Sequence, residues 1–275
     1  MSHPLGVVIV THNSQRVIGA CVAALDRQRV SLQVIMIDSG SDDTGYLEPF
    51  RNRPGFTVEC RDNIGFSAAS NAGFSLVDRR ANYVLFINPD TFVGENSLAS
   101  ALEIIASRPR IGALTGILKG YDIADHRPNG LIDSTGVFRT WYGRWYDRGQ
   151  GQQVGSGYGV EQEVPALCGA FMMCRVQALQ SVLEKPDSQL FDESYFMYKE
   201  DIDLSIRLRK RGWSLLYTPR VIVYHGRGWA KDRQQIDHQV RCLASANEVK
   251  LNLKHRSPYL LWSIGKYLAV RILHL

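Results

Sequence analysis

The chain has 275 residues, a formal net charge of +5 and a sequence pI near 9.0. This length can bury a sizeable core, and 45% apolar with 21% charged residues is typical of a globular protein rather than a disordered or fibrous one. The mild positive charge suits phosphate-bearing ligands or an anionic membrane surface, whereas the absence of zinc-finger spacing and of RNA-binding aromatic motifs predicts no nucleic-acid partner.

The cysteines and the hydropathy of the sequence predict where in the cell the protein resides. The five cysteines are scattered and none forms a CxxC pair, so we expect free thiols in a reducing environment. The N-terminus leads almost directly into a predicted strand, which argues against a signal peptide. No apolar stretch reaches the roughly 18–20 residues that a spanning helix needs. We therefore expect a cytoplasmic protein, soluble or peripheral on the inner face of the plasma membrane.

From Gly6 to Thr115, short β-branched runs alternate with helical segments. Strands are predicted at Gly6–Thr11, Val34–Asp38, Phe56–Cys60, Tyr83–Ile87 and Ile111–Thr115, and helices at Val17–Leu25, Ser67–Val77 and Ser97–Ser107. This alternation predicts an α/β fold, a doubly wound Rossmann-like layer with a mostly parallel sheet. Ligands of such sheets bind beyond the carboxyl ends of the strands, where Thr11, Asp38 and Asp90 all fall.

The pattern degrades between Lys119 and Glu163, which predicts a functional loop or an insertion on the acceptor side. Its aromatic and basic part, Thr140–Gln152, suits stacking on sugar rings, covering of a core edge, or, least favoured, stacking on nucleic-acid bases. The glycines of Gly155–Gly159 follow no strand and predict a flexible loop rather than a phosphate cradle. In the apolar segment Val164–Arg175 that follows, Gly169 would permit a close backbone approach.

A helix is predicted within Phe191–Trp213, directly after an aromatic run. Leu204 and Leu208 lie four residues apart, and Asp203 stands four residues before Arg207, the favourable order for an acid–base pair. Gly212 is a suitable residue to end the helix.

The acidic residues that begin this helix have two interpretations. They can complement the positive end of the helix dipole. Alternatively, Asp201 is a general base at the wall of a cleft, with Glu200 beside it.

The last part of the chain reads as two short strands, Ser214–Pro219 and Val221–His225, followed by a helical region from Asp232 to Leu275 that Pro258 divides. Tyr259–Leu275 is apolar with interspersed basic residues. It can lie in a membrane interface or pack on the domain or a second subunit, which would make a homo-oligomer. We expect one domain over residues 1–230 and a helical extension over 231–275.

A metal site is one interpretation of Asn88-Pro89-Asp90, which follows a predicted strand; a plain turn is the other. Mg²⁺ takes one or two protein carboxylates and fills its shell with water and phosphate oxygens, so Asp90 alone suits a cation held mainly by a diphosphate. His225 would add an imidazole that suits Mn²⁺, although a lone histidine is more often structural. With Asp201 as base, these residues describe group transfer from a diphosphate, and glycosyl transfer fits.

Six segments in fixed order carry a family resemblance. They are VVIVTHN (7–13), VIMIDSGSDDT (34–44), NIGFSAASNAG (63–73), YVLFINPDT (83–91), CGAFMMCR (168–175) and FDESYFMYKEDIDLSIRLRKRGW (191–213). Over about residues 5–230 the chain resembles family 2 glycosyltransferases, and most of all their bacterial rhamnosyltransferase branch, which acts on lipid-linked glycan precursors. The resemblance implies the GT-A fold, a nucleotide-diphospho-sugar donor, Mg²⁺ or Mn²⁺, and inversion of the anomeric centre.

The resemblance also implies roles for individual residues. Asp201 matches the base of the family's ED motif, with Glu200 beside it, and Asp90 matches the last residue of its DxD motif. Asn88 takes the place of the first acid of DxD, a departure that this branch shares and that weakens metal binding without donor. His225 matches a histidine that completes the metal site in some members. The positions that would line the donor site are Thr11, Asn13, Asp38, Ser39, Ser41, Asn63, Gly65, Asn71, Asn88 and Asp90.

The usual donor of the branch is dTDP-L-rhamnose, and a polyprenyl-diphosphate-linked glycan acceptor in cell-surface polysaccharide synthesis, such as that of O-antigen, would agree with the basic, apolar C-terminus. Processive synthases match less well, because the chain lacks their spanning helices and Gln-x-x-Arg-Trp motif. A non-catalytic nucleotide-sugar-binding protein would need no Glu200-Asp201 pair. A sugar-nucleotide nucleotidyltransferase would need a glycine-rich basic loop, which His12–Arg16 does not provide.

Overall fold

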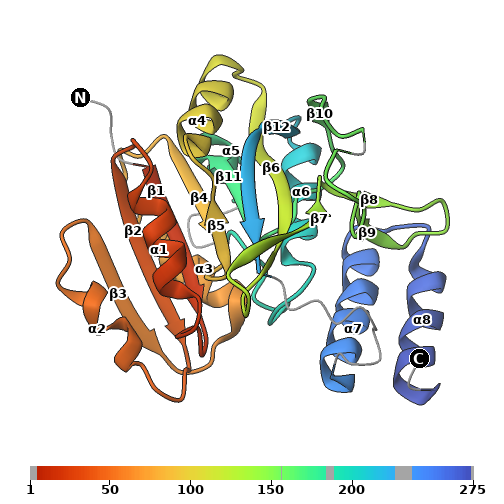
Figure 1. Ribbon diagram of the computed structural model, residues 1–275. Helices are drawn as coiled ribbons and strands as arrows, with labels where there is room; N and C mark the ends of the chain where they lie inside the picture. Colours follow the sequence, from red (N-terminus) through yellow and green to blue (C-terminus); the bar gives the residue numbers. More distant parts are fainter. Residues whose placement is uncertain (1–4, 156, 184–188, 227–236, 274–275) are drawn as a thin grey trace.

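The computed structural model describes residues 5–155, 157–183, 189–226 and 237–273, which form a mixed α/β fold around one curled sheet (Figure 1). Ten strands of the described residues make this sheet. They are β1 (Leu5–Thr11), β2 (Leu32–Ser39), β3 (Phe56–Arg61), β4 (Tyr83–Ile87), β5 (Thr91–Val93), β6 (Ile111–Asp122), β7 (Arg127–Ser134), β10 (Gln162–Glu163), β11 (Phe171–Arg175) and β12 (Ser214–His225). A separate hairpin contains β8 (Val137–Arg139) and β9 (Trp145–Asp147).

The helices are α1 (Ile18–Asp26), the 3-10 turn η1 (Gly45–Leu47), α2 (Glu48–Arg51), α3 (Gly65–Ser75), α4 (Ser97–Ser107), α5 (Val176–Ser181), α6 (Glu200–Lys210), α7 (His238–Lys254) and α8 (Leu260–Leu273). The strand order is β10-β12-β6-β11-β4-β1-β2-β3, with β5 on β12 and β7 on β6. The strands β4-β1-β2-β3 are parallel, as is β6 with β12. This arrangement confirms the predicted α/β class and the predicted parallel strands in the N-terminal part of the chain.

The core lies on both faces of the sheet because side chains alternate along each strand. In β1, Leu5, Val7 and Ile9 pack in the cluster that contains α1 and α4, whereas Val8 and Val10 pack with residues of α3, α5 and α6 on the other face. All seven residues of β1 are buried. A β-branched run that is apolar on both faces therefore gives a central strand.

One prediction about the second half of the chain is wrong. Ser214–Pro219 and Val221–His225 are one strand, β12, whose register on β6 shifts between Tyr217 and Ile222. Pro219 lies within the shift, and because proline has no N–H to donate, the ladder is interrupted while the strand continues. The segment Lys119–Glu163, predicted as a functional loop or an insertion, contains the end of β6 and the strands β7 to β10.

The C-terminal region is helical as predicted, with a break next to Pro258, while residues 232–236 lie outside the described part. Helices α7 and α8 lie side by side (Figure 1), joined by His238 Nε2 and Val270 O at 3.0 Å and by an ion pair of Lys266 with buried Glu248. Leu251 of α7 belongs to the main core cluster. Helix α7 is therefore anchored in the core of the preceding domain, and α8 is held against α7.

Candidate active site

The carboxylate of Asp38 organises the ends of β1 and β2. Asp38 is fully buried, and its Oδ2 accepts hydrogen bonds from Thr11 Oγ1 at 2.9 Å, Ser41 Oγ at 2.6 Å and Tyr46 OH at 2.8 Å. Its Oδ1 accepts the N–H of Ser41 at 3.0 Å. Burial raises the pKa of this carboxyl, but the hydrogen bonds outweigh burial and lower it overall. These contacts use the acceptor capacity of the carboxylate, so Asp38 acts by fixing the loop.

The neighbouring loops join the same network. Asn13 exchanges hydrogen bonds with Asp42 at 3.0 Å and donates its N–H to Ser41 Oγ at 2.7 Å. Ser39 Oγ accepts the N–H groups of Ile64 and Gly65, both at 3.1 Å. Ser39 Oγ also reaches the side chain of exposed Asn63 at 3.4 Å. The structure thus brings the predicted donor-side residues from three separate segments to one edge of the sheet.

Gly65 is required by its contact with the aromatic run before α6. Its φ is +80°, and a Cβ there would lie 2.5 Å from a ring carbon of Phe196. Phe196 O in turn accepts the N–H of Phe66 at 2.8 Å. Asn71, expected in the donor pocket, binds the segment just before this run. Its side-chain amide exchanges hydrogen bonds of 2.8 Å with the backbone of Phe191. Its observed role is to attach α3 to the segment that carries the acids.

The turn before α6 has a strained backbone. Tyr198 and Lys199 adopt φ values of +71° and +79°, a region that residues with a side chain rarely occupy. Buried Asn247 of α7 donates from Nδ2 to the carbonyl oxygens of Met197 and Tyr198 at 2.8 and 3.1 Å. The strained turn is therefore braced from the C-terminal helices.

Asp201 lies in the first turn of α6, as the sequence predicts. It is half-buried, and its Oδ2 accepts the N–H of Gly169 at 2.9 Å. A Cβ on Gly169 would approach Asp201 Cβ to 3.3 Å, which confirms the close approach expected of this glycine. Burial raises the pKa of Asp201, and the Gly169 hydrogen bond and the charge of Lys199 oppose that rise.

Glu200 differs from its neighbour in hydrogen bonding. It is buried, and its Oε2 has no hydrogen-bond partner among the described residues. Burial raises the pKa of Glu200 to about 8, and the charge of Asp201 adds to the rise. The pKa of Asp201 is raised as well, but only Asp201 receives the N–H of Gly169, which favours its ionised form over that of Glu200.

Asp203 has a structural role. It is fully buried and binds Arg207 Nε at 2.8 Å, His255 Nε2 at 2.8 Å and Lys254 Nζ at 2.9 Å. Burial alone would raise the pKa of Asp203, but the hydrogen bond with His255 and the charges of Arg207 and Lys254 lower it to about 2. The predicted Asp203–Arg207 pair is confirmed, and it extends to the end of α7.

His225, at the end of β12, is oriented by two carboxylates. Its Nδ1 lies 2.7 Å from Asp133 Oδ2, and its Nε2 lies 3.4 Å from Asp90 Oδ1. Burial alone lowers the pKa of His225, but the hydrogen bonds and charges of Asp133 and Asp90 outweigh it and raise the pKa to about 9. A carboxylate behind an imidazole is the usual partner of a metal-ligating histidine.

The residues present fit a cation that takes most of its ligands from elsewhere. Within the ranges that the structure covers, no three His, Cys, Asp or Glu side chains form a metal-binding group. Asp90 and His225 supply one carboxylate and one imidazole, a donor set that suits Mn²⁺ or Mg²⁺ bound together with a diphosphate.

The acidic pair and the Asp90–His225 pair are connected through a short backbone segment. Gly169 contacts Asp201, and the next residue, Ala170, accepts the N–H of Asn88 through its carbonyl at 3.1 Å. Asp90 O accepts the N–H of Gly226, next to His225, at 2.8 Å. The predicted base and the predicted metal ligands therefore lie on adjoining segments at one edge of the sheet.

Sequence reasoning missed Asp133 and Asn247. Asp133 lies near the end of β7, in a segment for which no strand was predicted, so no strand-end argument pointed to it. Asn247 lies in a helix whose contact with the Met197–Tyr198 turn spans some fifty residues of sequence. No local signal marked Asn247, because most of the buried residues of α7 are polar.

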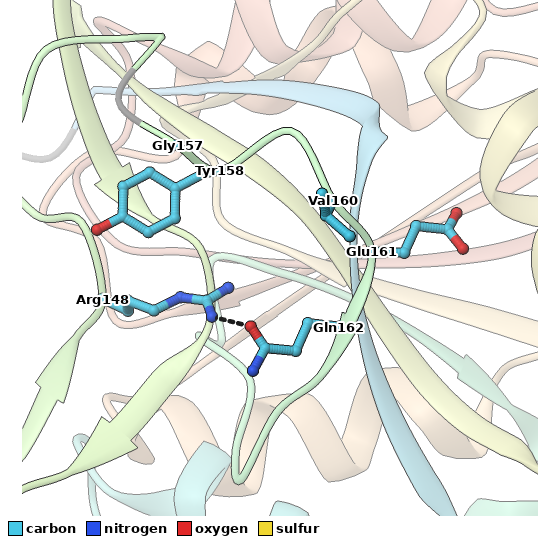
Figure 2. A pocket seen from close by; sticks show the side chains of 6 residues that line it. All are labelled: Arg148, Gly157, Tyr158, Val160, Glu161 and Gln162. Carbon is cyan, nitrogen blue, oxygen red and sulfur yellow. Dashed lines mark hydrogen bonds between the residues drawn. The ribbon is translucent and has the colours of Figure 1, made fainter.

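Within the aromatic and basic segment Thr140–Gln152, Arg148 covers an edge of the core. The guanidinium of Arg148 lies 4.5 Å from the ring centroid of Phe138, 5.4 Å from that of Tyr158 and 5.2 Å from that of Tyr217. Arg148 also binds Gln162 at the mouth of a cavity of about 260 Å³ (Figure 2). The cavity lining is Arg148, Gly157, Tyr158, Val160, Glu161 and Gln162.

Two curated glycosyltransferases are similar in sequence to most of this chain. The N-acetylglucosaminyl-diphospho-decaprenol L-rhamnosyltransferase of Mycobacterium tuberculosis is 26% identical over 262 residues, covering 86% of this chain and 81% of that protein. An N-acetylglucosaminyltransferase of Sinorhizobium fredii is 25% identical over 78% of this chain, which spans 51% of that protein's length.

Solved structures share the fold at low identity. The mannosyltransferase PcManGT of Pyrobaculum calidifontis, in complex with GDP-Man and Mn²⁺, has a TM-score of 0.61 at 14% identity, covering 98% of this chain and 74% of that one. GalNAc-T7 with UDP, GalNAc and Mn²⁺ has a TM-score of 0.60 at 13% identity, covering 95% of this chain and 56% of that one. The fold is therefore that of GT-A glycosyltransferases, as the resemblance implied.

The family model for "Glycosyltransferase like family 2" matches residues 3–241, almost the whole described domain. This match agrees with the six ordered motifs and with the placement of their residues at one edge of the sheet. The chain belongs to glycosyltransferase family 2 and is a glycosyltransferase.

Proposed function

We propose that the protein is a metal-dependent inverting glycosyltransferase that moves L-rhamnose from dTDP-L-rhamnose to a polyprenyl-diphosphate-linked glycan. The observation that carries the mechanism is Asp201, whose Oδ2 is fixed by the Gly169 N–H at 2.9 Å in the first turn of α6. The sugar and the acceptor class are supported by the name of the mycobacterial relative. The site of action is then the inner face of the membrane that contains the acceptor.

In this mechanism Asp201 removes the proton of the acceptor hydroxyl. The hydroxyl oxygen forms a bond to the anomeric carbon as the bond from that carbon to the diphosphate oxygen breaks on the opposite face, so the configuration inverts. Buried Glu200 keeps its own proton near neutral pH, because burial raises its pKa to about 8. We therefore assign the proton acceptor to Asp201, whose carboxylate receives the Gly169 N–H.

Asp90 and His225 would hold the Mg²⁺ or Mn²⁺ ion. Such a cation, when bound, neutralises the charge that develops on a leaving diphosphate. Asp133 orients the His225 ring from behind at 2.7 Å. Asn88 lies in the same turn as Asp90, so we assign it to the donor site.

The remaining donor contacts are assigned to the loops after β1, β2 and β3. Asn13, Ser41 and Asn63 belong to the exposed or partly exposed rim of these loops. Thr11, Asp38 and Ser39 lie beneath them and hold their shape. Gly65 lets the chain pass under Phe196, and Asn71 attaches α3 to the run before the base.

Donor turnover tests this proposal. Purified protein is incubated with Mn²⁺ or Mg²⁺, a panel of nucleotide-sugars and a lipid-linked glycan acceptor, and released nucleoside diphosphate is measured. We expect release that requires the metal, the acceptor and dTDP-L-rhamnose. Release that occurs with a different nucleotide-sugar and not with dTDP-L-rhamnose would contradict the donor assignment. Binding of a donor without any turnover would favour a non-catalytic nucleotide-sugar-binding protein.

Two variants assign the base. Asp201→Asn should lower kcat by about 10²–10⁴-fold, with donor affinity within about twofold of wild type, because it removes only the proton acceptor. Glu200→Gln keeps the shape of a protonated Glu200 and should retain most activity near pH 7. A Glu200→Gln variant as inactive as Asp201→Asn would make Glu200 the base instead.

A further inference from the structure

Helix α8 turns its apolar side to solvent. Among its described residues only Ser263 and Val270 are buried. Leu261, Ile264, Leu268 and Ile272 follow one another at spacings of three or four, which places them on one face, and they are 82%, 37%, 46% and 66% exposed. This is the reverse of the pattern of a helix that packs on a core through its apolar stripe.

Aromatic side chains continue this surface at one end of α8. Trp262 is 41% exposed, and its ring lies 5.0 Å from that of Tyr142. Next to Tyr142, Trp141 in the connection between β8 and β9 is 86% exposed. Arg139, on β8, binds Asn252 and Ser257 and so fixes the hairpin against the α7–α8 connection. The exposed tryptophans therefore belong to a braced surface rather than to a loose end.

The helical pair is strongly basic. Between His238 and Leu273 there are six Lys or Arg residues and one acidic residue, Glu248, a net charge of six minus one, or +5. That equals the net charge of the whole chain. Glu248 is buried, whereas Arg256 and Arg271 are exposed.

We propose that the exposed face of α8, with Trp141 and Trp262, docks on the surface of a bilayer that contains anionic lipids. Anionic headgroups complement the exposed basic side chains of the helical pair, such as Arg256 and Arg271, and exposed tryptophans favour the boundary between acyl chains and headgroups. A second copy of the chain would instead bring another surface of the same positive charge. No described helix is long and apolar enough to cross a membrane, so α8 lies along the surface.

This surface is mechanically connected to the base. Asn247 of α7 binds the turn directly before Glu200 and Asp201, and Lys266 of α8 pairs with Glu248 of α7. If the acceptor is lipid-linked, as the proposed function has it, docking through α8 holds the base next to the membrane in which the acceptor resides.

Vesicle sedimentation tests the docking surface without donor or acceptor. The full chain is mixed with vesicles of phosphatidylcholine alone or with phosphatidylglycerol, and the bound fraction is measured. We expect binding to the mixed vesicles that weakens as salt is raised. Leu261→Gln combined with Leu268→Gln should weaken binding at least about tenfold, because two apolar side chains no longer leave water.

The matched control is Val160→Gln, which alters an equally exposed apolar residue, 77% exposed, on the loop before β10. This variant should bind like wild type. Ile264→Gln with Ile272→Gln is a second pair on the same face, for use if thermal unfolding shows that the first variant is misfolded.

Two outcomes would overturn the proposal. One is equal binding of wild type and both folded α8 variants, or no binding of wild type. The other is a wild-type dimer by sedimentation equilibrium that both α8 variants dissociate, which would make the face a contact between copies. Neither readout depends on sugar transfer, so failure of the proposed reaction would leave the docking result interpretable.

Discussion

At the scale of the residue, two adjacent acids have opposite environments. Asp201 receives an N–H from Gly169 at 2.9 Å, whereas Glu200 Oε2 is buried without a partner among the described residues. The family resemblance assigns the base to Asp201 and places Glu200 beside it. The hydrogen bond from Gly169 supports that assignment, because it favours the ionised form of Asp201, whereas burial raises the pKa of Glu200.

The pH dependence of stability follows from Glu200. Its pKa rises from 4.5 to about 8 on folding, so between these values the folded state retains a proton that the unfolded state has lost. The stability that this proton contributes is complete below pH 4.5 and is lost as pH rises through 8. Urea unfolding at pH 5 and pH 8 should show that Glu200→Gln loses less stability than wild type over this interval. Parallel slopes for the two proteins would contradict the raised pKa.

At the scale of the element, α7 supports the active site from outside the sheet. Asn247 Nδ2 donates to the carbonyls of Met197 and Tyr198, and the latter residue has φ of +71°. A left-handed turn of residues with side chains persists only when surrounding contacts stabilise it. The start of α6, and with it Asp201, thus depends on a helix far away in sequence.

Asn247→Ala should therefore lower kcat by about tenfold with little change in the KM for donor, and should cost roughly 1–3 kcal/mol of stability because buried carbonyls lose their donor. The matched control is Asn252→Ala in the same helix, which removes a buried contact to Arg139 on the β8 side. That variant should lose comparable stability and keep its kcat. An equal loss of kcat in both variants would show that Asn247 acts through stability alone.

At the scale of the whole molecule, the predicted extension, residues 231–275, makes buried contacts with the predicted domain, residues 1–230. Leu251 is in the main core cluster, and Lys254 and His255 bind buried Asp203 of α6. If the C-terminal region unfolded by itself, Asp203 would lose Lys254 and His255 and keep Arg207, so a buried charge would be less well compensated, which is costly. We expect the described part of the chain to unfold as one unit.

Leu251→Ala and Leu253→Ala test this expectation with the same substitution two residues apart. Leu251 is 1% exposed and should cost roughly 2–5 kcal/mol, lowering the midpoint of one single thermal transition. Leu253 is 64% exposed and should change stability by less than about 0.5 kcal/mol. A separate early transition in Leu251→Ala, followed by unchanged unfolding of the rest, would instead establish an independent C-terminal unit.

The sequence by itself determined the α/β class, the parallel strands at its N-terminal side, the acid-bearing helix and the break at Pro258. These depend on local periodicity, on strand-end polar residues and on proline, all of which act over a few residues. The continuous β12, the strands within 119–163, the Asp133–His225 contact and the Asn247 brace were decided only by tertiary structure. Each depends on groups far apart in the chain, such as Asp133 and His225, whose 2.7 Å contact no local pattern encodes.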